Sequence, residues 1–90
     1  MRLIEAINEM DSFDDTHTIY ASSPFNADSD AFIAREPEAG GLPCHANGFT
    51  YFLEVVIARE FLTDWIVAQD HVPTLNEQCI RLIQYAVNDA

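Results

Sequence analysis

Adjacent Cys44 and His45 are the residues of this sequence whose types come closest to a catalytic pair. A thiolate beside an imidazole is the combination that a cysteine nucleophile needs. Side chains at neighbouring positions often point apart, however, and no third residue that would orient the histidine is evident. We therefore interpret Cys44 and His45 as loop residues, and keep them as the candidates for a site in segment 36–48.

A zinc site would need three or four converging ligands. Two cysteines and three histidines are available: Cys44, Cys79, His17, His45 and His71. None of them is spaced as Cys-x-x-Cys or as His-x-x-x-His. The sequence therefore predicts no bound metal and no cofactor, with Cys79 as a small core residue on the apolar side of a helix.

Asn26, Asp28 and Asp30 resemble the opening of a calcium-binding loop. The later positions do not fit, because Ala31 stands where a glycine is required and Pro37 where a bidentate glutamate is required. We interpret this segment as a turn that leads into a strand.

The charge of the chain is its strongest compositional signal. Fifteen Asp and Glu face four Arg and no Lys, so the formal net charge is −11. Such a surface repels the phosphates of nucleic acids and anionic lipids, and attracts a basic protein. Proteins of organisms that live at high salt concentration often have similar acidic surfaces, so the acidity can also be explained without a basic partner.

Several features of the sequence indicate a cytoplasmic protein. Residues 1–10 lack the basic and apolar regions of a signal peptide. No apolar run approaches the ~18 residues of a membrane-spanning helix. Two cysteines do not make a disulfide framework, and we expect both thiols to be reduced.

Hydrophobic spacing predicts the first elements of the fold. Apolar residues at helical spacing indicate a short helix over residues 2–10. Segments 17–21 and 30–35 have the composition of strands and could pair as an antiparallel hairpin. The irregular segment 36–48 between them and the next element is long for a loop of a compact domain, which favours either function or disorder.

Segment 49–69 is the centre of the sequence. Its apolar residues cover more than one side of a helix, so we predict a central apolar helix from about Thr50 to Gln69 that other elements must cover. Residues 49–53 are rich in strand-forming types, and a third strand there is the alternative. Its aromatic side chains are explained by core packing: Phe49, Tyr51, Phe52, Phe61 and Trp65.

The last helix is predicted over residues 75–88. Thr74 and Glu77 have the spacing of a capping box, in which each side chain accepts a hydrogen bond from the other residue's backbone amide. Ile80, Ile83 and Val87 are the predicted core stripe of this amphipathic helix.

Four strings of the chain resemble a family of short uncharacterised bacterial proteins: Thr-Ile-Tyr-Ala at 18–21, Tyr-Phe-Leu-Glu-Val at 51–55, Ala-Arg-Glu-Phe-Leu at 58–62 and the segment 81–90. The resemblance covers most of the chain and implies a bacterial, cytoplasmic origin. It implies no activity and no functional residues.

Together these patterns predict one small acidic α+β domain over residues 1–90, in the order α-β-β-α-α, with a β-hairpin packed on a central apolar helix and a C-terminal amphipathic helix. The leading hypothesis for its function is a non-enzymatic protein that binds a basic protein surface, as an immunity or regulatory protein would. The alternatives are a DNA mimic that inhibits a nucleic-acid-binding protein, and a small ligand-binding protein or enzyme that uses the 36–48 loop. A homodimer is also expected, because the central helix has more apolar surface than a hairpin and one helix can cover.

Overall fold

The structure of the chain, a computed structural model, describes residues 1–35 and 48–88. Its elements follow in the order α1 (Leu3–Glu9), the 3-10 helix η1 (Met10–Ser12), β1 (His17–Ala21), β2 (Ala31–Arg35), β3 (Thr50–Glu54), α2 (Val55–Val67) and α3 (Leu75–Asn88). The predicted α+β class is confirmed.

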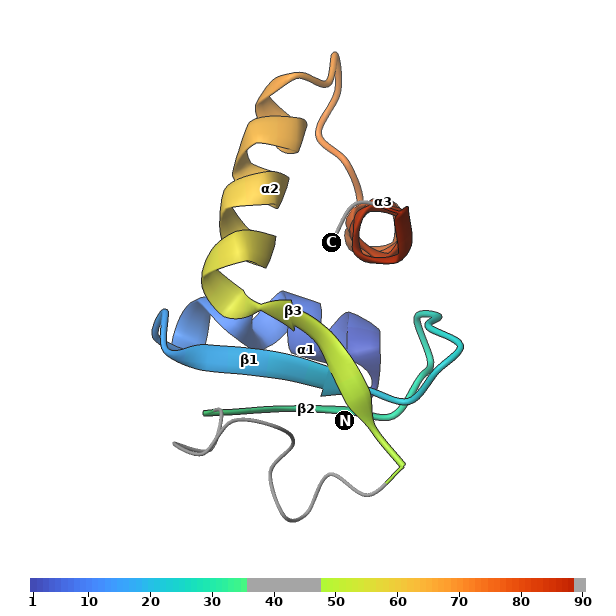
Figure 1. Cartoon of the computed structure of the whole chain (residues 1–90). Helices are drawn as coiled ribbons and strands as arrows, with labels where there is room; N and C mark the ends of the chain where they lie inside the picture. The colour runs from blue at the N-terminus through green and yellow to red at the C-terminus, as the bar shows by residue number, and fades with distance from the viewer. Residues whose placement is uncertain (36–47, 89–90) are drawn as a thin grey trace.

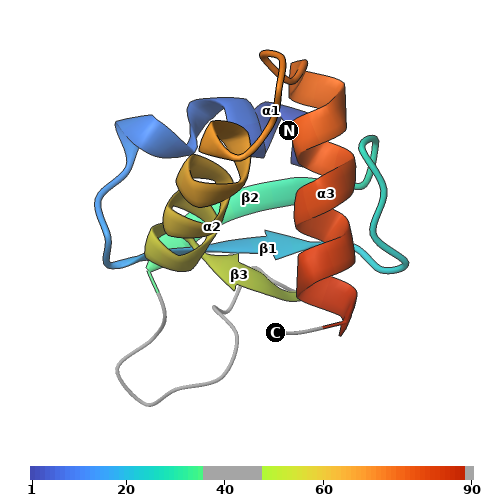
Figure 2. The ribbon, with the colours of Figure 1, turned by 90° about the horizontal axis from the view of Figure 1, so that it is seen from above.

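The three strands form an antiparallel sheet in the order β2-β1-β3, with β1 in the middle. Ile19 of β1 lies opposite Ile33 of β2 and Leu53 of β3. The register with β3 shifts between Ile19 and Tyr20, so that Phe52 is an extra residue at this bulge. The α-helices α1, α2 and α3 all lie over the same face of the sheet (Figures 1 and 2).

The central helix begins later than predicted, and its start at about Thr50 was wrong. Residues Thr50–Glu54 form the strand β3, which is the alternative that the strand-forming residues indicated. Pairing with β1 satisfies their backbone groups, and the chain turns helical only after Glu54, whose backbone is still extended at φ −68° and ψ 144°. The hairpin is therefore two strands of a three-stranded sheet.

The core lies between the sheet and the helices. The helix α2 buries a single stripe there, formed by Val55, Ala58 and Leu62 at positions i, i+3 and i+7. From the other elements, fully buried side chains include Leu3, Ile19, Leu53, Cys79 and Leu82. Other apolar residues of α2, among them Trp65 and Ile66, pack partly against the core, whereas Val67 is 80% exposed.

The helix α3 has its predicted bounds, and its capping box is confirmed. The Thr74 amide donates to Glu77 Oε1 at 2.9 Å, and the Glu77 amide donates to Thr74 Oγ1 at 3.1 Å. Its predicted core stripe was wrong for Ile80 and Val87, which are 49% and 63% exposed, whereas Ile83 packs partly against the core. The fully buried residues of the helix are Cys79 and Leu82. Apolar residues occupy two neighbouring sides of this helix, and only one of them meets the sheet.

No helix among residues 1–35 and 48–88 combines the length and the apolar character needed to cross a membrane.

Candidate functional site

The loop candidates Cys44 and His45 lie outside the described residues. The other cysteine, Cys79, is fully buried in the first half of α3. Burial and, to a smaller degree, the charge of Asp28 raise the pKa of its thiol to about 11. A thiol with such a pKa is a poor nucleophile at neutral pH, so Cys79 is a core residue as predicted.

The two described histidines pair with separate carboxylates. His17 Nδ1 lies 2.9 Å from Asp14 Oδ1, at the start of β1. His71 lies in the turn before α3, with Nδ1 3.1 Å from Asp70 Oδ1 and Nε2 3.3 Å from Glu77 Oε2. Within the described ranges, no group of three or more His, Cys, Asp or Glu residues is placed to hold a metal ion.

The segment that resembles a calcium loop forms a local turn. Asn26 Oδ1 accepts a hydrogen bond from the Asp28 amide at 2.9 Å. The Asp28 carboxylate points away to Arg2, whose Nη1 donates to it at 3.0 Å. These contacts are the turn chemistry that the sequence predicted.

The aromatic residues of segment 49–65 are divided among several places. Phe52 packs edge-on against Phe25 with ring centroids 5.0 Å apart, and Phe49 packs on Phe32 at the same separation. Phe61 stacks on Tyr85 of α3 at 4.2 Å. These rings join elements to one another and do not assemble into a common binding platform.

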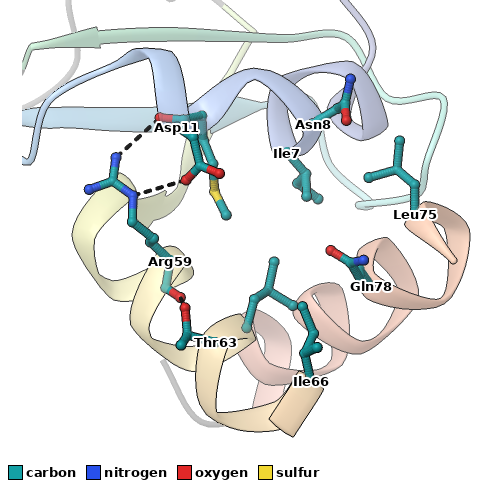
Figure 3. A pocket seen from close by; sticks show the side chains of 10 residues that line it. Ile7, Asn8, Asp11, Arg59, Thr63, Ile66, Leu75 and Gln78 are labelled. Carbon is teal, nitrogen blue, oxygen red and sulfur yellow. Dashed lines mark hydrogen bonds and ion pairs between the residues drawn. The ribbon is translucent and has the colours of Figure 1, made fainter. Parts of the chain in front are cut away.

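The candidate site is an open cleft between α1 with η1, α2 and α3 (Figure 3). Its volume is about 240 Å³. Its apolar lining consists of Ile7, Met10, Leu62, Ile66 and Leu75. Its polar lining consists of Asn8, Asp11, Arg59, Thr63 and Gln78.

Arg59 at one side of the cleft is held by four partners. Its Nε donates to Asp11 Oδ1 at 3.1 Å and its Nη1 to Asp15 Oδ1 at 2.7 Å. Its Nη2 donates to the carbonyls of Phe13 at 2.8 Å and Met10 at 3.3 Å. The guanidinium is therefore neutralised within the protein, and it joins α2 to the segment that follows α1. It is not a free site for an anion.

Apart from Arg59 and its partner Asp11, the polar groups that line the cleft are uncharged. The Thr63 hydroxyl donates to the Arg59 carbonyl at 2.8 Å, and Gln78 Nε2 donates to the Pro73 carbonyl at 3.2 Å. Figure 3 shows the amide of Asn8 on α1 and the amide of Gln78 on α3. The cleft can therefore bind an apolar side chain and offer amide groups to a neighbouring backbone.

A shallower hollow adjoins the cleft on α2. It is lined by Arg59, Glu60, Thr63 and Asp64, and so shares Arg59 and Thr63 with the cleft. Glu60 and Asp64 are exposed and lie one helical turn apart. Neither forms an ion pair with a described residue, so this hollow is acidic.

Sequence reasoning missed this site, because its residues come from three separate segments. The sequence did contain one signal of this site: Arg59 is the one cation in the segment predicted as the central helix. The arrangement suits the binding of an apolar side chain flanked by a cation. Around the cleft and hollow, the described residues include no cysteine or histidine that could act as a nucleophile or base.

No protein-family model matches the chain, and neither curated proteins nor solved structures gave a significant match. The resemblance to short bacterial proteins therefore stays a prediction.

Proposed function

We propose that this chain is a non-enzymatic acidic interaction protein of the cytoplasm, which binds a basic protein surface through the cleft and the hollow beside it. The observation that carries the proposal is the juxtaposition of an apolar floor with unpaired carboxylates. The cleft supplies the floor, and Glu60 and Asp64 supply the carboxylates. An immunity or regulatory protein would use such a surface.

The two hollows favour a partner that carries an apolar side chain next to lysine or arginine. The apolar side chain would enter between Ile7, Leu62 and Leu75 and lose its contact with water. The cation would lie over Glu60 and Asp64, in the hollow that shares Thr63 with the cleft. Protein interfaces commonly combine such a buried anchor with a polar rim.

The local charge supports the sign of the partner. Asp11 and Asp15 pair with Arg59, and Glu60 and Asp64 line the same hollow as Arg59, so four carboxylates accompany one cation here. Because these groups are exposed, they contribute more to the rate of encounter and to partner choice than to affinity. The same groups explain why added salt should weaken the complex.

The proposed alternatives have less support. A DNA mimic needs carboxylates in rows that imitate phosphates, whereas Asp11, Asp15 and Asp28 are engaged by Arg59 and Arg2. A ligand-binding protein or enzyme that uses the 36–48 loop depends on Cys44 and His45, which lie outside the described residues.

Affinity capture from the native cell with a salt titration tests the proposal. The informative variant is Thr63→Arg, which places a cation where the cleft and the hollow meet, at an exposed helical position that arginine tolerates well. Its matched control is Val67→Arg, which adds the same charge one turn further along α2 at a side chain that is 80% exposed.

We expect a basic partner that the wild-type chain and Val67→Arg retain, that Thr63→Arg loses, and that salt releases. A partner bound equally by both variants would show that binding occurs elsewhere. The absence of a basic partner would refute the proposal.

A further inference from the structure

His71 lies in the turn between α2 and α3, and both of its ring nitrogens face a carboxylate. Nδ1 lies 3.1 Å from Asp70 Oδ1, and Nε2 lies 3.3 Å from Glu77 Oε2. Ionised carboxylates only accept hydrogen bonds, and a neutral imidazole carries a single N–H. The ring can therefore donate to both carboxylates at once only when it is protonated.

Loss of the proton should keep one of these contacts and break the other. The contact with Asp70 is the shorter one, and it contributes most to raising the pKa of His71. Glu77 has another donor, because its Oε1 accepts the Thr74 amide at 2.9 Å. We therefore expect the neutral ring to keep its proton on Nδ1 for Asp70. The lone pair of Nε2 then faces the Glu77 carboxylate and repels it.

The other charged group close to Glu77 along α3 is engaged elsewhere. Arg81, one helical turn beyond Glu77, places its guanidinium over the ring of Phe61, 5.0 Å from the centroid. Within residues 1–35 and 48–88, Asp70 and Glu77 are the carboxylates that contact the ring of His71. The charge of His71 therefore decides how firmly the Oε2 atom of Glu77 is held.

Glu77 connects His71 to the wall of the cleft that α3 supplies. Thr74 and Glu77 form the capping box at which the helix begins. The next residue, Leu75, lines the cleft together with Gln78 (Figure 3). Gln78 is tied to the same turn, since its backbone amide donates to the Thr74 carbonyl at 3.0 Å. A change in the position of Glu77 therefore acts on the turn of α3 that carries both lining residues.

We propose that His71 is a proton-controlled latch on this wall of the cleft: the charged ring holds Glu77 at the first turn of α3, and the neutral ring stays on Asp70 and releases Glu77. The charge of one side chain thus biases the local opening of a helix end. Because both contacts raise the pKa of His71, the latch is closed below the ordinary value of about 6.5 and opens as the pH rises through the folded value. The link to partner binding rests on the proposed function, whereas the latch can be tested without a partner.

Nitrogen NMR of the full chain, from about pH 5.5 to pH 8.5, tests the latch. The ring nitrogens distinguish the two neutral tautomers, and we expect Nδ1–H for His71, whereas free histidine favours Nε2–H. Hydrogen exchange of the Gln78 amide is measured over the same range and corrected for the intrinsic effect of pH. It should become about two- to fivefold faster as His71 loses its proton, which corresponds to the loss of an exposed ion pair.

Two variants should abolish this change in exchange while the helix is kept. Glu77→Gln retains the capping box, which accepts glutamine, and its amide can donate to the neutral ring of His71. Asp70→Asn leaves one carboxylate at the ring, so the neutral ring can keep its proton on Nε2 for Glu77. His17 is the internal control, because it lies at the start of β1, and its titration should leave the exchange of Gln78 unaffected.

Three results would overturn the latch. They are an Nε2–H tautomer of neutral His71 in the wild-type chain, an exchange rate of the Gln78 amide that does not follow the titration of His71, and a change in that rate that persists in Glu77→Gln. A confirmed latch in a chain that captures no basic partner would refute the proposed function alone, so the two failures can be distinguished.

Discussion

The guanidinium of Arg59 on α2 donates a hydrogen bond to the carboxylate of Asp15, 2.7 Å away and 44 residues earlier in the chain. The same guanidinium also binds the carbonyls of Met10 and Phe13. One side chain thus fixes the path of the segment that leads from η1 to β1. Met10 and Asp11 of η1, where this segment begins, line the cleft, so Arg59 supports the site without being open to a ligand.

Replacement of Arg59 by alanine should therefore destabilise the protein. It leaves the partly buried carbonyl of Phe13 without this donor and removes both ion pairs, while the Met10 carbonyl keeps its hydrogen bond from the Phe13 amide. Because the side chain is 33% exposed, we expect the free energy of unfolding to fall by about 1–2 kcal/mol, in urea denaturation followed by circular dichroism.

Arg35→Ala is the control for this loss of charge. Arg35 is 68% exposed and lies 3.6 Å from Asp14, so its removal should change the free energy of unfolding by less than about 0.5 kcal/mol. Equal losses from both variants would contradict the anchoring role of Arg59.

Cys79 should make the protein less stable at alkaline pH. Burial raises the pKa of its thiol to about 11, whereas a cysteine of the unfolded chain titrates near about 8.5. Below the unfolded pKa both states hold the proton and the free energy of unfolding is unaffected. Between the two pKa values only the unfolded chain loses the proton, so the free energy of unfolding falls by up to about 1.4 kcal/mol per pH unit.

Urea denaturation at several pH values from 8 to 11 measures this slope, in a Cys44→Ser background that removes the other thiol. The variant Cys79→Ala should show a smaller slope, although it is less stable at neutral pH because the core loses a buried sulfur. An unchanged slope would show that the thiol of Cys79 is not responsible.

His71 should titrate above the ordinary histidine range. Its hydrogen bond to Asp70, followed by that to Glu77, raises the pKa of the imidazole. The stabilisation from these pairs is present below the unfolded pKa of about 6.5 and is lost as the pH rises through the folded value. A proton NMR titration of the His71 ring measures this pKa.

Asp70→Asn is the informative variant for His71. Asp70 makes the larger contribution, and unlike Glu77 it has no part in the capping box of α3. The variant should lower the pKa of His71 toward the ordinary value and leave the helix intact. A pKa that does not move would show that the Asp70 contact is absent in solution.

The parts of the fold that depend on local chemistry could be predicted from the sequence, and those that depend on distant contacts could not. The bounds of α3 were predictable because Thr74 and Glu77 begin it through neighbouring backbone amides. The strand at 50–54 depends on pairing with β1, about thirty residues away, and local spacing favoured a helix instead. Which apolar side of α3 is buried depends on the sheet, and the cleft depends on contacts of Arg59 across the chain.

The capping box of α3 provides the last prediction. The Thr74 hydroxyl accepts the Glu77 amide, which otherwise has no partner in the first turn of the helix. Thr74→Ala should lower the free energy of unfolding by about 1 kcal/mol in urea denaturation. Thr63→Ala is the matched control, because Thr63 is exposed within α2 and, among the residues that the structure describes, its hydroxyl bonds one carbonyl of the preceding turn. It should change stability by less than about 0.5 kcal/mol, since mid-helix threonines gain little from that bond. A Thr74→Ala protein as stable as the wild type would mean that water serves the Glu77 amide equally well.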